Sequence, residues 1–404
     1  MKIFVINSIL GSGATGVVAE NLILGLIEKG LEIRIISERN HSKLISHEIP
    51  IVLEGKHLID NEFITKLCIT TLSYPANEVL WIQQGKKIFK NIIKSWRPDF
   101  IMVLTSAGGL HLIELGRILS KAYKIKLYIH STDPMPAPVM WKEKPPLRRG
   151  IRNIMRRCFR QASLFSLSNE TMLNYQLKMI GEDKKENAFV VPNPVRGPFV
   201  KRDKSTDSFN FLYLGNILFN RRPDKIIQAF LEFAINQPNV KLQFVGKKNP
   251  DLSSLAIPEN LSHFIEILPW TDNPDEYIKK ASVLLDFDAP FENDVFISSK
   301  LIKYLNSDVP ILSITCKNSP SEILLGEIKE SAVVTDYDQK RMIAAFEKVF
   351  LIARTKDSGE IEKERASIIS RFHYHNVTGL IANKLNAQYF DPMMLKSTIQ
   401  KTLK

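Results

Sequence analysis

Residues 209–245 contain two apolar runs of strand length with a helical segment between them, and this order restricts the fold of the whole chain. The first run, Phe209–Leu214, ends at Gly215, and the second, Val240–Val245, ends at Gly246. Strand, helix and strand in this order form the repeating unit of a parallel sheet, so we predict an α/β fold. The helical segment has apolar residues at three- and four-residue spacing, namely Ile226, Ile227, Phe230, Leu231 and Phe233.

The loop after the first of these strands runs from Gly215 to Arg222 and carries two adjacent arginines, Arg221 and Arg222. Ligands of parallel α/β sheets bind beyond the carboxyl ends of the strands, and this loop lies at such an end. It offers backbone N–H groups, the N-terminus of a helix and two guanidinium groups, which together suit an anion. We predict that it binds a phosphate or a diphosphate.

The N-terminal segment repeats the strand, helix and strand order around a glycine-rich loop. The strand Lys2–Asn7 is followed by Gly11-Ser12-Gly13-Ala14-Thr15-Gly16, by a helix over Val17–Lys29 and by the strand Leu31–Ser37. The loop has G-x-G-x-x-G spacing, and Glu38 stands near the place of the acidic residue in dinucleotide-binding folds. The motif alone leaves three interpretations open: dinucleotide binding, the floor of a substrate cleft, or a glycine turn that lets the helix pack closely.

A further strand, Lys126–Ile129, ends in the polar residues His130-Ser131-Thr132-Asp133, followed by a proline-rich loop. Polar side chains at the carboxyl end of a strand, followed by a long loop, mark a candidate site. We predict that His130 orients a substrate hydroxyl; the alternative is a histidine satisfied by local backbone. Asp133 precedes Pro134, so its alternative role is to shape a turn.

The second half of the chain contains another candidate anion site and a pair of aspartates. Ser298 or Ser299 caps a predicted helix, so two hydroxyls and Lys300 gather at a helix N-terminus. Asp286 and Asp288 have the spacing of a D-x-D metal motif, but they fall in an apolar strand without a third carboxylate in register. We therefore predict no metal site.

Length and composition limit the class of protein. A chain of 404 residues exceeds one core and predicts two domains, divided by a polar linker over 196–208. No apolar run is long enough to span a bilayer, and the N-terminus lacks the apolar region of a signal peptide, so we predict a cytoplasmic protein. The cysteines at 68, 158 and 316 are too widely spaced for a metal pattern or a disulfide framework.

The net charge of +12 predicts attraction to an acidic partner, and Lys142–Arg160 is the most basic segment. The helix predicted in this segment has a cationic face on one side, and its apolar residues can face either the core or a bilayer surface. We predict docking to an anionic membrane or a phosphorylated lipid carrier; the alternative is a solvated basic face. Nucleic acid is disfavoured, because aromatic residues are not interleaved with the charges. The cationic face comprises Arg149, Arg152, Arg156 and Arg160.

Several short motifs occur in a fixed order along the chain. They are the glycine loop after the first strand, Trp96-Arg97-Pro98-Asp99, Val191-Pro192-Asn193-Pro194-Val195, Tyr213-Leu214-Gly215, Ala229-Phe230, Phe244-Val245-Gly246, Ser299-Lys300-Leu301 with Tyr304-Leu305, and Pro310-Ile311-Leu312. Each is weak alone, but the series resembles the family 4 glycosyltransferases of the GT-B fold over almost the whole chain.

The resemblance implies two Rossmann-like domains with doubly wound parallel sheets that face each other across a cleft. Residues 1–197 would form the acceptor-side domain and residues 198–375 the nucleotide-sugar donor domain. Residues 376–404 would form a closing helix that returns toward the N-terminal domain, followed by a polar tail.

The resemblance also implies roles for individual residues. The catalytic residues would be His130, Arg221 and Lys300. Gly11, Ser131 and Asp133 would lie on the acceptor side. The donor and its diphosphate would be bound by Gly13, Gly16, Gly215, Asn216, Arg221, Arg222, Ser298, Ser299, Lys300, Glu292 and Asp294.

Three positions depart from the family's pattern. Many relatives have arginine after the glycine of the first strand of the second domain, where this chain has Asn216. Many also have two glutamates eight positions apart around the donor-site helix, and these fall on Val295 and Lys303. The usual glutamate contact with the ribose is therefore not expected, and Glu292 or Asp294 is the candidate to replace it. An altered donor and a loss of activity are the other consequences that the departures allow.

The resemblance implies transfer of a hexosyl group from a nucleotide-sugar, most often a UDP-sugar, to an acceptor hydroxyl. The transfer would retain the anomeric configuration and use no metal or other cofactor. A saccharide or a lipid-linked acceptor would fit the assembly of cell-surface polysaccharide or glycolipid at the inner membrane face, with no nucleic acid as partner. Two other classes stay open: a nucleotide-sugar epimerase of the same fold, and a non-catalytic scaffold or binding protein.

Overall fold

The computed structural model describes residues 1–45, 50–52, 62–138, 144–182, 186–203, 208–217, 221–237, 239–247 and 257–389. The chain divides into two compact units. The first comprises Met1–Arg196 together with Phe372–Lys404, and the second comprises Gly197–Arg371. The predicted end of the donor domain, residue 375, lies inside α14 (Tyr374–Tyr389). In the structure the second unit ends earlier, at Arg371, and the chain belongs to the first unit again from Phe372.

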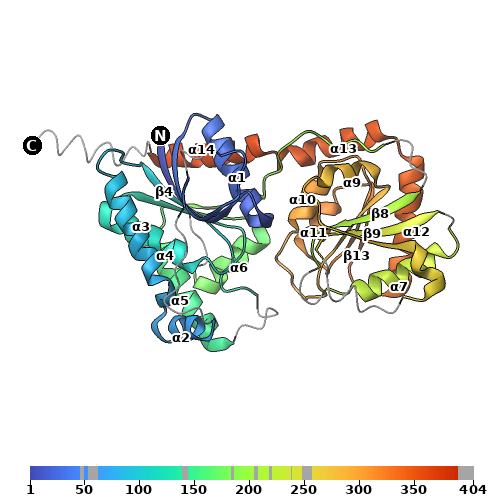
Figure 1. Cartoon of the computed structure of the whole chain (residues 1–404), viewed down its shortest axis with the longest axis horizontal. Coiled ribbons are helices and arrows are strands. Elements are labelled where there is room, and N and C mark those ends of the chain that lie inside the picture. Colours follow the sequence, from blue (N-terminus) through green and yellow to red (C-terminus); the bar gives the residue numbers. More distant parts are fainter. Residues whose placement is uncertain are drawn as a thin grey trace, which may run out of the picture. The chain divides into compact units, whose positions relative to one another are not determined.

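The first unit is built on a seven-stranded sheet in which all neighbouring strands are parallel (Figure 1). The strand order is β3-β2-β1-β4-β5-β6-β7, which is a doubly wound topology with its switch point between β1 and β4. The strands are β1 (Lys2–Leu10), β2 (Glu32–Asn40), β3 (Pro50–Val52), β4 (Phe100–Thr105), β5 (Lys126–Ser131), β6 (Leu164–Leu167) and β7 (Ala188–Val190).

Helices pack on this sheet, and β4 is buried along its whole length. Helices α1 (Gly13–Glu28) and α14 lie side by side (Figure 1) and share one core with the strands. Gly25 of α1 permits this contact, since a Cβ atom there would lie 2.6 Å from the side chain of Thr378. The other helices of this unit are α2 (Glu62–Leu72), the 3-10 helix η1 (Ala76–Glu78), α3 (Val79–Ile92), α4 (Leu110–Tyr123), α5 (Pro145–Gln161) and α6 (Glu170–Ile180).

The second unit repeats the design with six parallel strands in the order β10-β9-β8-β11-β12-β13. They are β8 (Phe209–Leu214), β9 (Val240–Val245), β10 (Ile265–Leu268), β11 (Val283–Phe287), β12 (Ile311–Ile314) and β13 (Ser331–Val334). The switch point lies between β8 and β11. The helices are α7 (Pro223–Ala234), η3 (Glu259–Phe264), α9 (Pro274–Lys280), α10 (Ser299–Leu305), α11 (Pro320–Leu325), α12 (Gln339–Thr355) and α13 (Ser358–Ser370).

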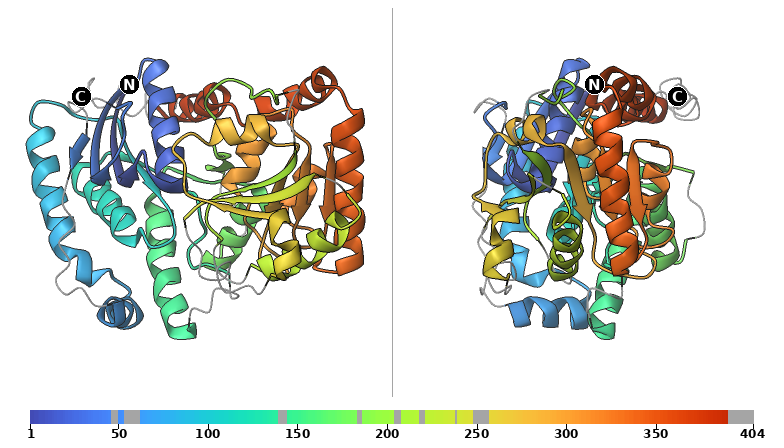
Figure 2. Two further views of the ribbon diagram at one scale, coloured as in Figure 1. Left: turned by 45° about the vertical axis from the view of Figure 1, so that its right-hand side comes forward. Right: turned by 90° about the vertical axis from the view of Figure 1, so that its right-hand side faces the viewer.

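The core of the second unit is aromatic where α7 and α12 pack on the sheet. Figure 2 shows α12, in orange, lying along this sheet. Four rings, those of Phe211, Phe230, Phe233 and Phe346, lie with their centroids 5.3 to 6.1 Å apart. Tilted and edge-to-face ring pairs at such distances stabilise a core beyond the area that they bury. The stretch that starts at Phe209 therefore supplies both a strand and a large part of this core.

Most predicted elements are present with shifted ends, and a few were not predicted. The motif Trp96-Arg97-Pro98-Asp99 follows η1 and α3, and α3 ends at Ile92, four residues before the motif. Pro98 restricts the residue before it to extended backbone, and Asp99 already donates its N–H to the Lys2 carbonyl beside β1. Helices α2 and α11 and strand β3 show no clear periodicity in the sequence, and α11 and β3 have only six and three residues.

Helix α5 is the described part of the basic segment; Lys142 lies outside the described residues. Its apolar residues at positions 151, 154, 155 and 159 are buried, so they face the core and not a bilayer. Arg149 and Arg152 are exposed. None of the described helices is both long and apolar enough to cross a membrane. Three other arginines bind groups of the same unit: Arg156 the Ile180 carbonyl oxygen, Arg157 the Glu114 carboxylate and Arg160 the Glu182 carboxylate.

Candidate functional site

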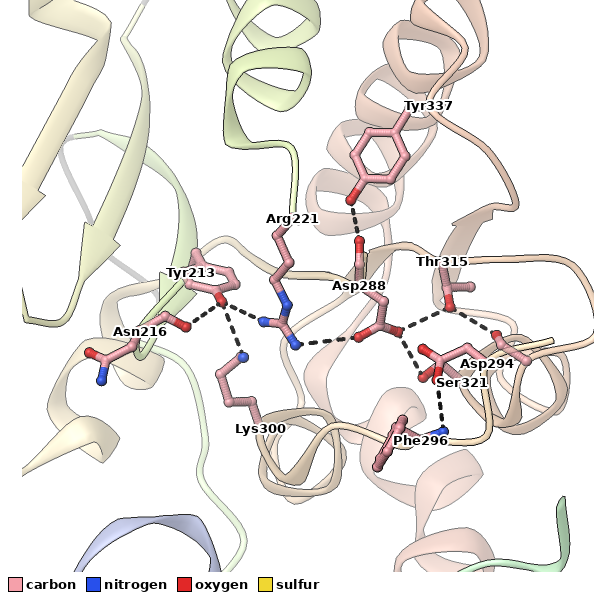
Figure 3. Close-up of polar contacts among 11 residues, drawn as sticks. Tyr213, Asn216, Arg221, Asp288, Asp294, Phe296, Lys300, Thr315, Ser321 and Tyr337 are labelled. Carbon is pink, nitrogen blue, oxygen red and sulfur yellow. Dashed lines mark hydrogen bonds and ion pairs between the residues drawn. The ribbon is translucent and has the colours of Figure 1, made fainter. Parts of the chain in front are cut away.

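At the carboxyl end of β8, one phenolic hydroxyl brings two cations together (Figure 3). Arg221 Nη1 donates to Tyr213 Oη at 2.8 Å, and Lys300 Nζ donates to the same oxygen at 3.2 Å. The hydroxyl donates in turn to the backbone oxygen of Asn216 at 3.1 Å. Lys300 Nζ also lies 4.8 Å from the centre of the Tyr213 ring. Two cations that belong to separate predicted anion-binding segments, and that the family resemblance assigns to one donor site, therefore form one cluster.

The ends of three elements position this cluster. Tyr213 is the second-last residue of β8 and is fully buried, with its ring centroid 4.6 Å from that of Phe287. Gly215 follows with φ +99°, in the left-handed region that favours glycine. A side chain at Gly246 would collide with this turn, since a Cβ atom there would lie 2.6 Å from the Gly215 oxygen. Lys300 reaches the cluster from the first turn of α10.

A carboxylate stands on the other side of Arg221. Asp288 follows directly after β11, and its Oδ1 lies 3.6 Å from Arg221 Nη2. Its Oδ2 accepts hydrogen bonds from Thr315 Oγ1 at 3.0 Å and from Ser321 Oγ at 3.3 Å. The Tyr337 hydroxyl donates to the backbone oxygen of Asp288 (Figure 3). These contacts hold one carboxylate oxygen toward the guanidinium group.

Burial and neighbouring charges shift the pKa values in opposite directions. Burial alone would lower the pKa of Arg221, but Tyr213 and Asp288 more than offset this effect and the net shift is upward. Burial, and next the charge of Asp286, raise the pKa of Asp288, while Arg221 opposes this rise. The Asp286 carboxylate is fully buried and has no hydrogen-bond partner among the described residues. The site therefore combines two cations, Arg221 and Lys300, with two buried aspartates, Asp286 and Asp288.

The two adjacent arginines of the loop are used differently. Arg222 is exposed and pairs with Asp224 at 2.7 Å, whereas Arg221 belongs to the cluster. Asn216 gives its backbone oxygen to the cluster, and its side-chain Oδ1 accepts from the Lys247 N–H at 3.1 Å. Residues 218–220 of the predicted anion-binding loop lie outside the described residues.

The remaining donor-side residues lie around the start of α10. Asp294 is buried and its Oδ1 accepts from the Phe296 N–H at 3.0 Å, while Glu292 is exposed. Ser298 is the N-cap residue of α10, followed by Ser299, and the side chain of Ser298 makes no capping hydrogen bond within the described residues. The hydroxyl of Ser298 is therefore not used by the helix that it precedes.

The two positions at which the family resemblance implies glutamate, 295 and 303, carry other residues with other contacts. Val295 is buried, with 4% of its surface exposed. Lys303 Nζ pairs with Asp275 Oδ1 of α9 at 2.8 Å. No carboxylate of this chain thus replaces either glutamate at its own position.

A pocket opens at the switch point of the first unit, where β1 and β4 end. Among its lining residues, Asn7 and His130 each have a buried nitrogen, Nδ2 and Nε2 respectively, without a hydrogen-bond partner among the described residues. Leaving buried polar groups unpaired costs stability, so such groups in a pocket mark a candidate ligand site. The other polar lining residues are Ser8, Thr15, Thr105, Ser106 and Thr132.

A chain of two hydrogen bonds orients the imidazole of His130 through its Nδ1 atom. Its Nδ1 lies 2.9 Å from Ser166 Oγ, which lies 2.8 Å from Tyr128 Oη. Burial lowers the pKa of His130 to about 4. The ring is therefore neutral near pH 7, and Nε2 is either a donor or an acceptor according to the tautomer.

We expect the His130 side chain to remain neutral from pH 5 to pH 8. Because burial disfavours the charged form, its protonation should begin only as the pH falls toward 4. The measurement is the pH dependence of the imidazole nitrogen shifts of the ¹⁵N-histidine-labelled protein, assigned with a His130→Asn variant. A transition of the His130 signal centred near pH 6.5 would contradict the prediction.

The glycine-rich loop borders the same pocket. Gly11 and Gly13 have φ values of +70° and +67°, and the Gly11 N–H donates to the Gly16 oxygen at 3.2 Å. Glu38, which stands near the place of the acid in dinucleotide-binding folds, lies 2.8 Å from His111 Nε2. The glutamate is therefore engaged within the protein, and the loop supplies a wall of the pocket through Thr15.

The predicted acceptor-side residues Ser131 and Asp133 make hydrogen bonds within their own turn and, through Asp133, with the loop after β4. Ser131 Oγ donates to the Asp133 backbone oxygen at 2.6 Å. The Asp133 carboxylate accepts from the Ala107 N–H at 3.2 Å and from Thr132 Oγ1 at 3.3 Å. These bonds connect the ends of β4 and β5 and place Thr132 beside the pocket.

No protein-family model matches the chain. A curated relative from Methanocaldococcus jannaschii, described as an uncharacterized glycosyltransferase, is 22% identical over 284 residues. The match spans 63% of this chain and 66% of the relative, slightly less than two thirds of its length.

Solved structures match almost the whole chain. The apo lipopolysaccharide outer core galactosyltransferase WaaB aligns with a TM-score of 0.62 and 14% identity, covering 96% of this chain and 100% of its own. HepE from Anabaena, in complex with UDP-glucose, aligns with a TM-score of 0.69 and 12% identity at the same coverage. A Listeria monocytogenes protein provisionally described as a UDP-N-acetylglucosamine 2-epimerase has a TM-score of 0.58 and 12% identity, covering 97% and 98%. The chain has the GT-B fold, which the two doubly wound units show directly.

Sequence reasoning missed three residues of these sites. Tyr213 belongs to the motif Tyr213-Leu214-Gly215, but nothing in a strand pattern shows that its hydroxyl accepts from two cations. Asp288 has the D-x-D spacing with Asp286 that resembles a metal motif, and this spacing does not show that Asp288 faces Arg221. Asn7 follows an apolar run at a strand end, which was the one signal available for it.

Proposed function

We propose that the protein is a glycosyltransferase that moves a sugar from a nucleotide-sugar to an acceptor hydroxyl. The observation that carries the proposal is the meeting of Arg221 and Lys300 at the Tyr213 hydroxyl, beyond the end of a central strand. Two fixed cations at one point suit a diphosphate, and nucleotide-sugars carry their sugar on a diphosphate. The relative and the solved structures named above support this proposal.

Charge stabilisation at the leaving group explains how such a site would work. Cleavage of the bond between sugar and diphosphate leaves negative charge on the diphosphate, while the sugar becomes oxocarbenium-like. Donors that are already in place stabilise that charge as it develops. Arg221 and Lys300 are the residues proposed for this role, with no metal. We further propose family 4 chemistry, with retention of configuration and with the leaving phosphate helping to deprotonate the acceptor hydroxyl.

The pocket of the first unit is proposed to bind hydroxyl groups of a sugar. The Asn7 amide is a donor, and neutral His130 is a donor or an acceptor, so both match neutral hydroxyls better than charged groups. Polar residues and one helix N-terminus surround these two nitrogens. This assignment keeps His130 as a residue that orients substrate, with Asn7 as its added partner.

The proposed donor is a UDP-hexose, and the proposed acceptor is a saccharide or a lipid-linked sugar in polysaccharide or glycolipid assembly. A neighbour of the same fold was solved with UDP-glucose, which supports uridine as the first base to test. We also propose peripheral contact with an anionic membrane at the cytoplasmic face. Arg149 and Arg152 support it as exposed cations of α5, and the contact would be electrostatic because the apolar residues of α5 are buried.

An epimerase of the same fold is the second candidate, because one matching structure is provisionally described in that way. An epimerase would return a nucleotide-sugar with inverted configuration at one carbon, whereas a transferase releases the free nucleotide. Analysis of the products from a single donor incubation therefore separates the two activities.

Thermal shift against nucleotide-sugars tests the proposal. UDP-glucose, GDP-mannose, ADP-glucose and a CMP-sugar are each added to the full chain without metal. A ligand at about a hundred times its dissociation constant adds about 2.7 kcal/mol of stability, so one base should raise the melting temperature clearly. Release of the free nucleotide in the presence of acceptor extracts would then show transfer. No shift with any of the four would contradict the proposed donor site.

A further inference from the structure

The proposed donor site contains a carboxylate that competes with the anion it is meant to bind. We propose that Asp288 is a positioning residue that acts through Arg221 and couples the binding of a diphosphate donor to the uptake of one proton. The inference rests on the proposed function and adds to it a residue and a proton linkage.

The geometry fixes which oxygen is involved. Asp288 Oδ2 already accepts from the hydroxyls of Thr315 and Ser321, at 3.0 and 3.3 Å. Oδ1 lies 3.6 Å from Arg221 Nη2, beyond ordinary hydrogen-bond length but within ion-pair distance. Oδ1 is therefore the oxygen that an incoming anion approaches, and it is the oxygen left to take a proton. A protonated Oδ1 would be a donor where the ionised form is only an acceptor.

The charges around Asp288 come from several elements. Arg221, before α7, and Lys300, on α10, favour the ionised carboxylate, whereas Asp286 and Asp294 oppose it. Tyr337 and Cys316 are further titratable neighbours among the described residues. Asp286 is the second-last residue of β11, and its carboxylate oxygens have no hydrogen-bond partner among the described residues. A bound diphosphate adds further negative charge to this cluster, which already contains both cations and carboxylates.

The direction of the coupling follows from these charges. A negative ligand beside Arg221 disfavours the ionised form of Asp288, so the pKa of Asp288 is higher in the complex than in the free protein. Binding then takes a proton from the buffer and forms an O–H bond on Asp288. Affinity is highest at low pH, where Asp288 is already neutral, and it falls as the pH rises through the pKa of the free protein. Burial has already raised that pKa above its ordinary value, which brings the coupling toward neutral pH.

Isothermal titration calorimetry of the full chain with UDP-glucose measures this coupling. At one pH, titrations in two buffers of different ionisation enthalpy give the number of protons taken up. UDP-glucose is used because its diphosphate is a diester, whereas the terminal phosphate of free UDP has a second pKa near 6 and would titrate by itself. We expect uptake of a substantial fraction of one proton near pH 7, and a dissociation constant that rises up to about tenfold per pH unit.

The variant Asp288→Asn keeps the size of the side chain and an oxygen that accepts from Thr315 and Ser321. It removes the charge beside Arg221, so we expect tighter UDP-glucose binding than in the unchanged protein at pH 8, by about tenfold. Proton uptake should disappear and the dissociation constant should become nearly independent of pH. Asp224→Asn is the matched control, because Asp224 pairs with the exposed Arg222, and its proton uptake should equal that of the unchanged protein.

The outcomes separate this inference from the proposed function. If UDP-glucose binds without proton uptake, or if Asp288→Asn binds it less tightly at pH 8, the inference is wrong while the donor site stands. If neither UDP-glucose nor any other nucleotide-sugar binds the unchanged protein, the proposed function itself is wrong. Should Asp288→Asn fail to fold, the proton uptake of the unchanged protein still decides the question.

Discussion

Replacement of Arg221 by alanine should weaken nucleotide-sugar binding about ten- to a hundredfold. The guanidinium group is fixed between the Tyr213 hydroxyl and the Asp288 carboxylate, so it needs little reorganisation when an anion arrives. A hydrogen bond to a charged group contributes about 1.5–3 kcal/mol, which corresponds to the stated change in dissociation constant. The measurement is calorimetry with UDP-glucose, or with the nucleotide-sugar that gives the largest thermal shift.

Arg222→Ala is the matched control for Arg221→Ala. Arg222 has the same chemistry one residue away, but it is exposed and paired with Asp224, so its loss should weaken binding far less. An additional Asp288→Asn change should restore part of the affinity lost in Arg221→Ala, because it removes a carboxylate that has lost its cation. Equal effects of the two arginine variants would mean that the Arg221 cluster is not the anion site.

The architecture could be predicted because parallel sheets buried on both faces leave a strong signal. Continuous apolar runs such as Phe209–Leu214 and Val240–Val245, separated by a helix period, allow few other folds. The same signal fails for short elements. The three residues of β3 and the six of α11 are too few to show a period, and tertiary packing decides their conformation.

The site could be predicted only in part, because it depends on side-chain direction across long sequence separations. Arg221 and Lys300 were both expected to bind an anion, but 87 residues separate Tyr213 from Lys300. Spacing in the sequence cannot show that one hydroxyl accepts from both cations. The spacing of Asp286 and Asp288 resembles a metal motif, whereas the cation beside Asp288 is Arg221, from the segment that precedes α7.

Helix α5 shows a limit of a different kind. Its sequence has a cationic face and an apolar face, and this pattern fits a core helix and a membrane-surface helix equally well. Burial of Ile151, Ile154 and Phe159 decides for the core. The pattern of charges also cannot show which arginines of the helix are paired. In the structure Arg157 forms an ion pair with Glu114, whereas Arg149 is exposed.

Replacement of Arg365 by alanine should destabilise the second unit by about 3–5 kcal/mol, the usual consequence of breaking a buried charged network. Arg365 of α13 is fully buried, and its Nη1 donates to the backbone oxygens of Tyr304 and Ser307 where α10 ends. Burial lowers its pKa to about 10, so it still carries its charge at pH 7, and Glu330 and Asp308 oppose this lowering. Its removal would take the guanidinium donor from the Ser307 carbonyl beyond the end of the helix that carries Lys300, whereas the Tyr304 carbonyl keeps the hydrogen bond from Ser307 Oγ.

Thermal unfolding of the full chain, followed by circular dichroism, measures this loss. At about 2–4 °C per kcal/mol for a unit of this size, the transition should fall by roughly 6–20 °C. Lys363→Ala is the matched control, since Lys363 is an exposed residue of the same helix and surface substitutions usually stay within about 0.5 kcal/mol. An unchanged transition in Arg365→Ala would mean that water replaces the guanidinium group at little cost. A lowered transition with unchanged nucleotide-sugar binding at low temperature would instead show that α10 keeps Lys300 in place without this cap.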